Sequence, residues 1–84
     1  MDKRKVCFDM IDKERKYQEQ QFESGRWERM SQSPMEFLAD IRVYSRKAEE
    51  AFVETGSDKE ALRRICQIAA LAVACLEKIS TRFI

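Results

Sequence analysis

The sequence predicts an all-helical (all-α) protein, a single domain over residues 1–84 with three helices, two of which form an antiparallel hairpin. Composition is the first reason, because the 84 residues include two glycines and one proline and are rich in helix-forming residues. Second, no segment alternates apolar and polar residues as a half-buried strand does. Third, Ser33 and Ser57 each begin a helix-start signal ahead of a long helical pattern.

The first helix is expected over residues 2–23. Its apolar positions recur at helical spacing among charged residues: Val6, Cys7, Met10, Ile11 and Tyr17. Ser24 and Gly25 form the expected stop, since glycine readily adopts the left-handed conformation that closes many helices. Trp27 lies in the connection that follows. We expect it to be partly exposed, packing the connection against the hairpin or meeting a neighbouring subunit.

The second helix is expected over residues 34–55. Ser33 is a typical N-cap, Pro34 suits the first helical position, and Glu36 completes a capping box. Gly56 ends the pattern. The apolar positions between them recur in steps of three and four and predict one buried stripe: Phe37, Leu38, Ile41, Tyr44, Ala48, Ala51 and Phe52.

The third helix is expected over residues 58–80, because the segment from Ser57 to Glu60 repeats the capping-box pattern. Only a short link separates it from the second helix, so the two are expected to form an antiparallel hairpin.

Residues 65–76 of this third helix, ICQIAALAVACL, are apolar except for Gln67. A helix that is apolar nearly all round is normally covered on every side, and this short chain has little with which to cover it. We therefore expect a homo-oligomer, a dimer or higher, formed through the third helix. At about 18 Å the run is too short to span a membrane. The residues expected at the interface are Ile65, Gln67, Ile68, Ala70, Leu71, Ala74 and Cys75.

Gln67 needs a polar partner if it is buried, because an unsatisfied amide is costly away from water. In an oligomer it can pair with a second Gln67 or with Tyr44 and so fix the register of the helices. Contact with a ligand is the alternative.

The charge balance and the cysteines exclude several classes of function. Sixteen basic and fifteen acidic residues nearly cancel, so no overall field favours nucleic acid or anionic lipid. The charged start of the sequence has no apolar stretch of signal-peptide length, so we expect a cytoplasmic protein. The three cysteines are expected to be thiols that pack as small apolar groups. The sequence has no histidine, no CxxC spacing for zinc and no glycine-rich phosphate loop.

Three blocks carry a family resemblance: IDKERKYQ at residues 11–18, SPMEFL at 33–38 and QIAALAVACLE at 67–77. In order and approximate spacing they resemble the small MazG-like proteins often encoded by phages and prophages. These are relatives of the all-helical nucleoside triphosphate pyrophosphohydrolases. The family has an ER-x-x-Q segment, a P-x-E-W-L entry and a Q-V-A-A-V-A-V-A-W-x-E run at the corresponding places.

The resemblance also implies where catalytic residues would lie. Active members hold magnesium with an E-E-x-x-E motif in one hairpin helix and an E-x-x-D motif in the other. Alignment on the shared blocks places non-acidic residues at these positions: Val43, Tyr44, Lys47, Arg64 and Gln67. The resemblance therefore implies a scaffold that has lost its metal site, with no metal, cofactor or catalytic residue. The alternative is a magnesium site displaced to other acids: Asp40, Glu49 and Glu50.

Basic residues gather in the same two helical regions and are candidates for phosphate binding without a metal: Arg42, Arg46, Lys47, Arg63 and Arg64. Alternatively, they are solvated charges that pair with Glu49, Glu50 or Glu60.

The sequence thus favours a non-catalytic helical binding module on a MazG-like scaffold, encoded by a phage or prophage, that binds a host protein or sequesters a nucleotide. The alternative is a magnesium-dependent nucleoside triphosphate pyrophosphohydrolase. A nucleic-acid-binding hairpin is disfavoured because acids are interspersed with the bases.

Overall fold

The computed structural model describes residues 2–25 and 33–80, and within these ranges it contains three helices and no strand. They are α1 (Lys3–Glu23), α2 (Pro34–Thr55) and α3 (Asp58–Ile79). The all-helical prediction is confirmed, and the expected boundaries agree with the observed ones to within one residue. Trp27 lies outside the described residues.

The helix ends follow the signals in the sequence. The Asp2 carboxylate accepts hydrogen bonds from the backbone N–H groups of Arg4 and Lys5, at 3.0 and 3.2 Å, and caps α1. Ser33 Oγ accepts from the N–H of Glu36 at 3.2 Å and caps α2. Ser57 Oγ accepts from the N–H of Lys59 at 3.3 Å, so this cap uses the second helical residue rather than the third.

Two glycines lie where the chain leaves a helix. Gly25 follows α1 with a φ of 78°, and Gly56 ends α2 with a φ of 63°. The N–H of Gly56 donates to the carbonyl of Phe52 at 2.8 Å. Both φ values fall in the left-handed region that favours glycine, which explains why α1 and α2 stop at these positions.

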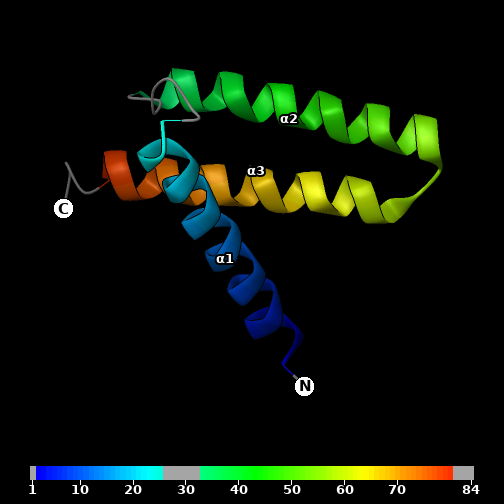
Figure 1. The fold of residues 1–84 in the computed structure, drawn as a ribbon, viewed down its shortest axis with the longest axis horizontal. Helices are drawn as coiled ribbons and strands as arrows, with labels where there is room; N and C mark the ends of the chain where they lie inside the picture. The colour runs from blue at the N-terminus through cyan, green and yellow to red at the C-terminus, as the bar shows by residue number, and fades with distance from the viewer. Residues whose placement is uncertain (1, 26–32, 81–84) are drawn as a thin grey trace.

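The helices form a hairpin with a third helix laid across it (Figure 1). α2 and α3 lie side by side in opposite directions and are joined by the short link at Gly56 and Ser57. α1 packs on the C-terminal half of α3, and its N-terminal half projects away from the hairpin. Among the described helices, α1 contacts α3 and does not contact α2. The α3 helix is therefore the central element, touched by each of the others.

The buried apolar core of the described residues is small. It consists of Phe37 from α2 and Ala70, Leu71 and Ala74 from α3. Many large apolar side chains are instead exposed: Val6, Phe8, Met10, Tyr17, Phe22, Met35, Leu38, Val43, Phe52, Val53, Leu62, Ile65 and Leu76. None of the described helices combines the length and apolar character needed to cross a bilayer.

Most apolar residues of α1 are exposed. Val6, Met10 and Tyr17, which follow helical spacing in the sequence, are exposed by 41, 52 and 49%. α1 packs on α3 through a different face, whose most buried members are Arg15 and Gln18. On α2 the expected stripe is only partly buried, because Phe37 is covered while Leu38 and Phe52 are half exposed.

Candidate functional site

The contact between α1 and α3 is polar. Arg15 retains 8% of its accessible surface and Gln18 retains 4%. Nη2 of Arg15 lies 3.1 Å from Oε2 of Glu77 on α3 and 3.1 Å from Oε1 of Glu19 on α1. Nε2 of Gln18 donates to the backbone carbonyl of Gln67 at 3.3 Å. These bonds attach α1 to the middle and the end of α3.

Two of the sequence blocks that carry the family resemblance meet at this crossing. Arg15 and Gln18 belong to the block at residues 11–18, and their partners Gln67 and Glu77 are the first and last residues of the block at 67–77. These contacts between α1 and α3 were not predicted from the sequence. The available signal was spacing, since Ile11, Arg15 and Gln18 lie on one face of a helix.

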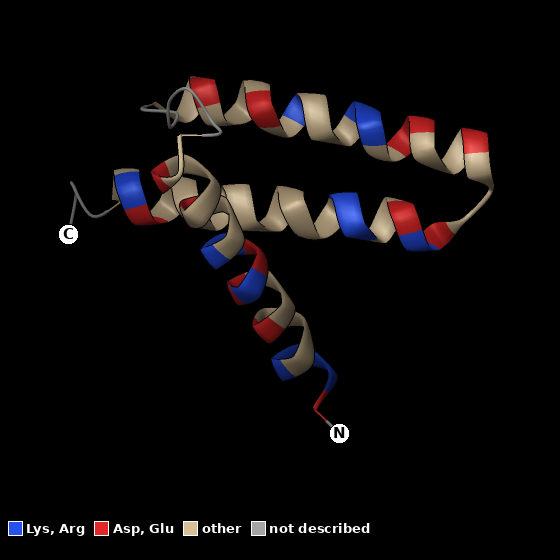
Figure 2. Ribbon diagram, viewed as in Figure 1, with Lys and Arg blue, Asp and Glu red and all other residues tan. Residues whose placement is uncertain are grey.

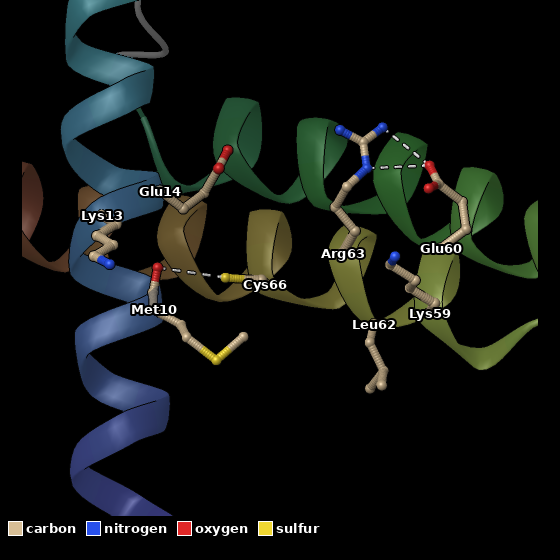
Figure 3. Close-up of a pocket in the computed structure, with 8 residues that line it drawn as sticks. All are labelled: Met10, Lys13, Glu14, Lys59, Glu60, Leu62, Arg63 and Cys66. Carbon is tan, nitrogen blue, oxygen red and sulfur yellow. Dashed lines mark hydrogen bonds and ion pairs between the residues drawn. The ribbon is translucent and has the colours of Figure 1, made fainter.

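Beyond the crossing, α1 and α3 diverge and enclose the surface that we call the α1/α3 groove. One part of it, about 680 Å³ in volume, is shown in Figure 3 and is lined by Met10, Lys13, Glu14, Lys59, Glu60, Leu62, Arg63 and Cys66. The other part, about 330 Å³, is more apolar and is lined by Cys7, Met10, Ile11, Leu62, Ile65, Cys66 and Ala69. Met10, Leu62 and Cys66 line both parts, so the two are continuous.

Charges of both signs line the wider part of the groove. Nε and Nη2 of Arg63 donate to Oε1 of Glu60 at 3.2 and 2.9 Å (Figure 3). This pairing lowers the pKa of the Glu60 carboxyl and raises the pKa of the Arg63 guanidinium. Partial burial raises the pKa of Glu14, and this effect outweighs a hydrogen bond with Gln18 and the positive charge of Arg63.

The Cys66 thiol is also part of the groove wall. Its Sγ donates to the carbonyl of Met10 at 3.6 Å, which joins α3 to the first half of α1 (Figure 3). Burial raises the pKa of Cys66, and the neighbouring Glu14 and Cys7 raise it further. The thiol is therefore protonated near neutral pH and is a poor nucleophile. Cys7, Cys66 and Cys75 are all free thiols.

The five candidate phosphate-binding residues lie in different surroundings and do not form one cluster. Arg63 lines the groove and is paired with Glu60. Arg64 donates from Nη1 to Oε1 of Gln67 at 3.1 Å, and its Nε lies 3.7 Å from Oε1 of Glu60. The remaining three are on α2: Arg42, Arg46 and Lys47, all exposed, with the Lys47 ammonium 5.1 Å from the centre of the Tyr44 ring.

The acids considered for a displaced magnesium site are spread along α2. Asp40 and Glu50 are ten residues apart, which separates their backbones by about 15 Å along the helix axis. Asp40 is half-buried, whereas Glu49 and Glu50 are exposed. Over residues 2–25 and 33–80, no three His, Cys, Asp or Glu side chains are grouped so that they could hold a metal ion.

The residues expected at an oligomer interface differ in exposure. Ala70, Leu71 and Ala74 are already buried within a single chain. Gln67, Ile68 and Cys75 are half-buried, and Ile65 is 52% exposed. Gln67 has partners inside the chain, namely Arg64 for its side-chain oxygen and Gln18 for its backbone carbonyl. Of the seven expected residues, Ile65 is therefore the one whose surface is most available to a second copy.

Comparisons of the chain with protein-family models, with curated proteins and with solved structures found no match. The resemblance to MazG-like proteins stays a prediction that rests on the three sequence blocks.

Proposed function

We propose that this chain is a non-catalytic helical interaction module on a MazG-like scaffold, and that it works by binding other proteins, including copies of itself. The observation that carries the proposal is the mismatch between its small buried core and its extensive exposed apolar surface. Each helix contributes to that surface, with Met10 on α1, Phe52 on α2 and Leu76 on α3 exposed by 52, 51 and 62%. Some of these side chains, Met10, Leu62 and Ile65, lie together between α1 and α3, and apolar surface gathered in this way is typical of protein-binding sites.

The arrangement of charges favours a protein partner over a nucleotide. Arg63 and Arg64 direct their guanidinium groups toward Glu60 and Gln67, so a phosphate would have to displace these partners. Figure 2 shows acidic and basic residues interspersed on all three helices. A polyanion gains little from such a surface because attraction and repulsion largely cancel.

A photo-crosslinking experiment tests the proposal. Benzoylphenylalanine replaces Met10, Phe52 or Leu76, one apolar position on each helix, and the variants are irradiated in the organism that encodes the protein. Asp12, Arg42 and Asp58 are matched control positions, because each is an exposed polar residue on the same helix as its counterpart. We expect adducts with a different protein from Phe52 or Leu76 and none from the controls. The absence of such adducts at all three apolar positions would contradict partner binding.

A thermal-shift series separates this proposal from the nucleotide alternatives. Nucleoside triphosphates and monophosphates are added with and without magnesium, and pyrophosphate release is measured in parallel. A ligand at about 100 times its dissociation constant stabilises a domain by roughly 2.7 kcal/mol, which is easily detected for a small protein. We expect no shift and no pyrophosphate. A magnesium-dependent shift with pyrophosphate release would favour the pyrophosphohydrolase, and a magnesium-independent shift would favour nucleotide sequestration.

A further inference from the structure

The packing face of α1 continues beyond the part of the helix that α3 covers. Phe8 lies seven residues before Arg15, nearly two full turns, so it is on the same side of the helix about 10 Å nearer the N-terminus. Arg15 is buried against α3, whereas Phe8 is 62% exposed. Cys7, on the neighbouring position, is also exposed, although it lines the apolar part of the α1/α3 groove. The first half of α1 thus has an apolar face that the chain itself leaves open.

The facing wall of the groove is apolar and open as well. Leu62, Cys66 and Ala69 recur at helical spacing along α3 and line the groove together with Ile65. Leu62 and Ile65 are 59 and 52% exposed. Two apolar helix faces that diverge from one crossing point form a notch, and the side chains of a further helix can pack between them.

The accessible surface of the chain is larger than that of a compact monomer of the same mass. The chain exposes 6596 Å², whereas a compact monomer of 9.9 kDa is expected to expose about 5200 Å². Its radius of gyration is 13.8 Å, against about 12 Å for a compact domain of this length. The surplus, about 1400 Å², exceeds the roughly 800 Å² that each partner buries in a standard protein interface. One chain therefore has enough surplus surface for a stable dimer.

The charges around the notch favour a second copy of the same chain over a polyanion or a membrane. Lys13 is next to Glu14 on α1, and Lys59 is next to Glu60 on α3, so each wall carries both signs. When two identical surfaces meet across a twofold axis, each such pair can face its opposite in the partner. An anionic ligand would instead be opposed by Glu14 and Glu60.

We propose that the α1/α3 groove is a homodimer interface in which the projecting half of α1 from each copy lies in the notch between α1 and α3 of the other. This inference rests on the proposed function, since it names one partner of the interaction module. It places the contact on Met10, Leu62 and Ile65 rather than on the alanines of α3, which are already covered within the chain. The outer face of α2 stays available for a different protein.

Sedimentation equilibrium of the full chain tests the dimer. We expect wild type to have twice the mass of one chain, and Met10→Glu and Leu62→Glu to raise the dissociation constant by about 100-fold. Val53→Glu is the matched control, because Val53 is 81% exposed on α2 and does not line the groove. A wild-type chain that stays monomeric up to millimolar concentration overturns the proposal. So does a dimer that the groove variants leave intact.

Thiol labelling of the wild-type protein gives a second test that needs no variant. Cys7 is exposed in one chain and is covered in the proposed dimer, whereas Cys75 lies outside the groove. With a maleimide, we expect labelling of Cys7, measured by peptide mass spectrometry, to slow several-fold as protein concentration increases, while labelling of Cys75 does not. An unchanged Cys7 rate in a solution that is dimeric by mass overturns the groove as the interface.

The photo-crosslinking experiment distinguishes the two proposals. Adducts of two identical chains at Met10 support the dimer, and adducts with a different protein at Phe52 or Leu76 support the proposed function. Adducts with a different protein alone, from a monomeric chain, overturn the dimer and leave the proposed function standing. Adducts of two identical chains alone support the dimer and contradict the binding of a different protein.

Discussion

At the scale of single residues, polar side chains occupy the positions where two packed helices ordinarily place apolar ones. Arg15 and Gln18 are the most buried residues of α1, and both bond to α3. Within the described part of the chain, Nε of Arg15 is buried without a hydrogen-bond acceptor. A buried ion pair is weak evidence for stability, because desolvation offsets much of its attraction. We expect these residues to act mainly by fixing where α1 crosses α3.

Substitution of Arg15 separates packing from charge. Arg15→Met keeps most of the aliphatic contact and removes the buried guanidinium, so we expect a free energy of unfolding equal to or slightly above that of wild type. Arg15→Ala also loses the packing, and we expect a loss of about 1–2 kcal/mol. Urea denaturation measures both. A Met variant as unstable as the Ala variant would mean that the ion pair with Glu77, rather than packing, holds α1 in place.

The raised pKa of Glu14 predicts a pH-dependent effect. Its carboxylate is partly desolvated in the folded chain, so the charged form is disfavoured relative to the unfolded state. At pH 7 this lowers the stability of wild type, and we expect Glu14→Gln to unfold at a higher temperature. As pH falls through the raised pKa, the folded wild type takes up a proton and the difference narrows. Glu50→Gln, an exposed change on α2, is the control; a difference independent of pH would contradict the effect.

At the scale of the helices, the signals that start and end each helix come from nearby residues, whereas the face that packs is set by residues far away in the sequence. The caps at Asp2, Ser33 and Ser57 form within a few residues of each helix start. They depend on backbone groups that every helix leaves unpaired at its ends, and the sequence predicted those at Ser33 and Ser57. Which side of each helix is buried depends on where the neighbouring helix lies.

Gly56 gives a test of the link between α2 and α3. A Cβ at this position would meet no atom within 4 Å, so a substitution is penalised by the left-handed φ alone. We expect Gly56→Ala to reduce the free energy of unfolding by about 1 kcal/mol. Gly56→Asn should cost less, because asparagine tolerates the left-handed region better. Thermal denaturation followed by circular dichroism measures both, and equal losses would indicate that something other than φ is responsible.

Ala70 tests the tight packing at the centre of α3. It is fully buried by the chain's own helices, so a larger side chain has no space. We expect Ala70→Leu to destabilise the chain by about 1–3 kcal/mol. Ala39→Leu, an exposed change on α2, should be close to neutral. If Ala70→Leu left both the stability and the solution mass unaltered, the packing of α3 against its neighbours would be contradicted.

At the scale of the whole molecule, the balance between buried and exposed apolar surface decides stability. A domain of this size is marginal unless a disulfide, a metal or a second subunit supports it. The three cysteines are free, and the described residues hold no group suited to a metal. In the proposed dimer, contact with the second copy supplies the additional stability.

The proposed dimer predicts a melting temperature that depends on concentration. Association stabilises the folded state by mass action, so dilution favours unfolding. We expect the melting temperature of wild type to rise steadily over a hundredfold increase in concentration. Met10→Glu should melt at the same temperature throughout, and Val53→Glu should behave as wild type. Differential scanning calorimetry measures all three, and a wild-type value independent of concentration would contradict assembly.

Features of the fold that depend on residues close together in the chain were predicted from the sequence better than features that depend on distant residues. Composition, helical periodicity and capping signals were sufficient for the helix boundaries and the hairpin, because each is set by residues near one another in the chain. The same periodicity did not indicate which side of α1 packs on α3, since Val6, Met10 and Tyr17 follow helical spacing and are nevertheless exposed. Apolar spacing alone does not distinguish a face that meets the chain's own core from one that stays exposed.

The all-helical fold, the helix ends and the tight link at Gly56 could be predicted from the sequence alone, since they follow from backbone geometry and local hydrogen bonds. The packed helices were needed to show that α1 crosses α3 through Arg15 and Gln18, that Arg63 and Arg64 are directed toward Glu60 and Gln67, and that a groove opens beside Met10 and Leu62. The physical reason is that each of these features depends on the angle at which two helices pack, and that angle is set by contacts between residues far apart in the sequence.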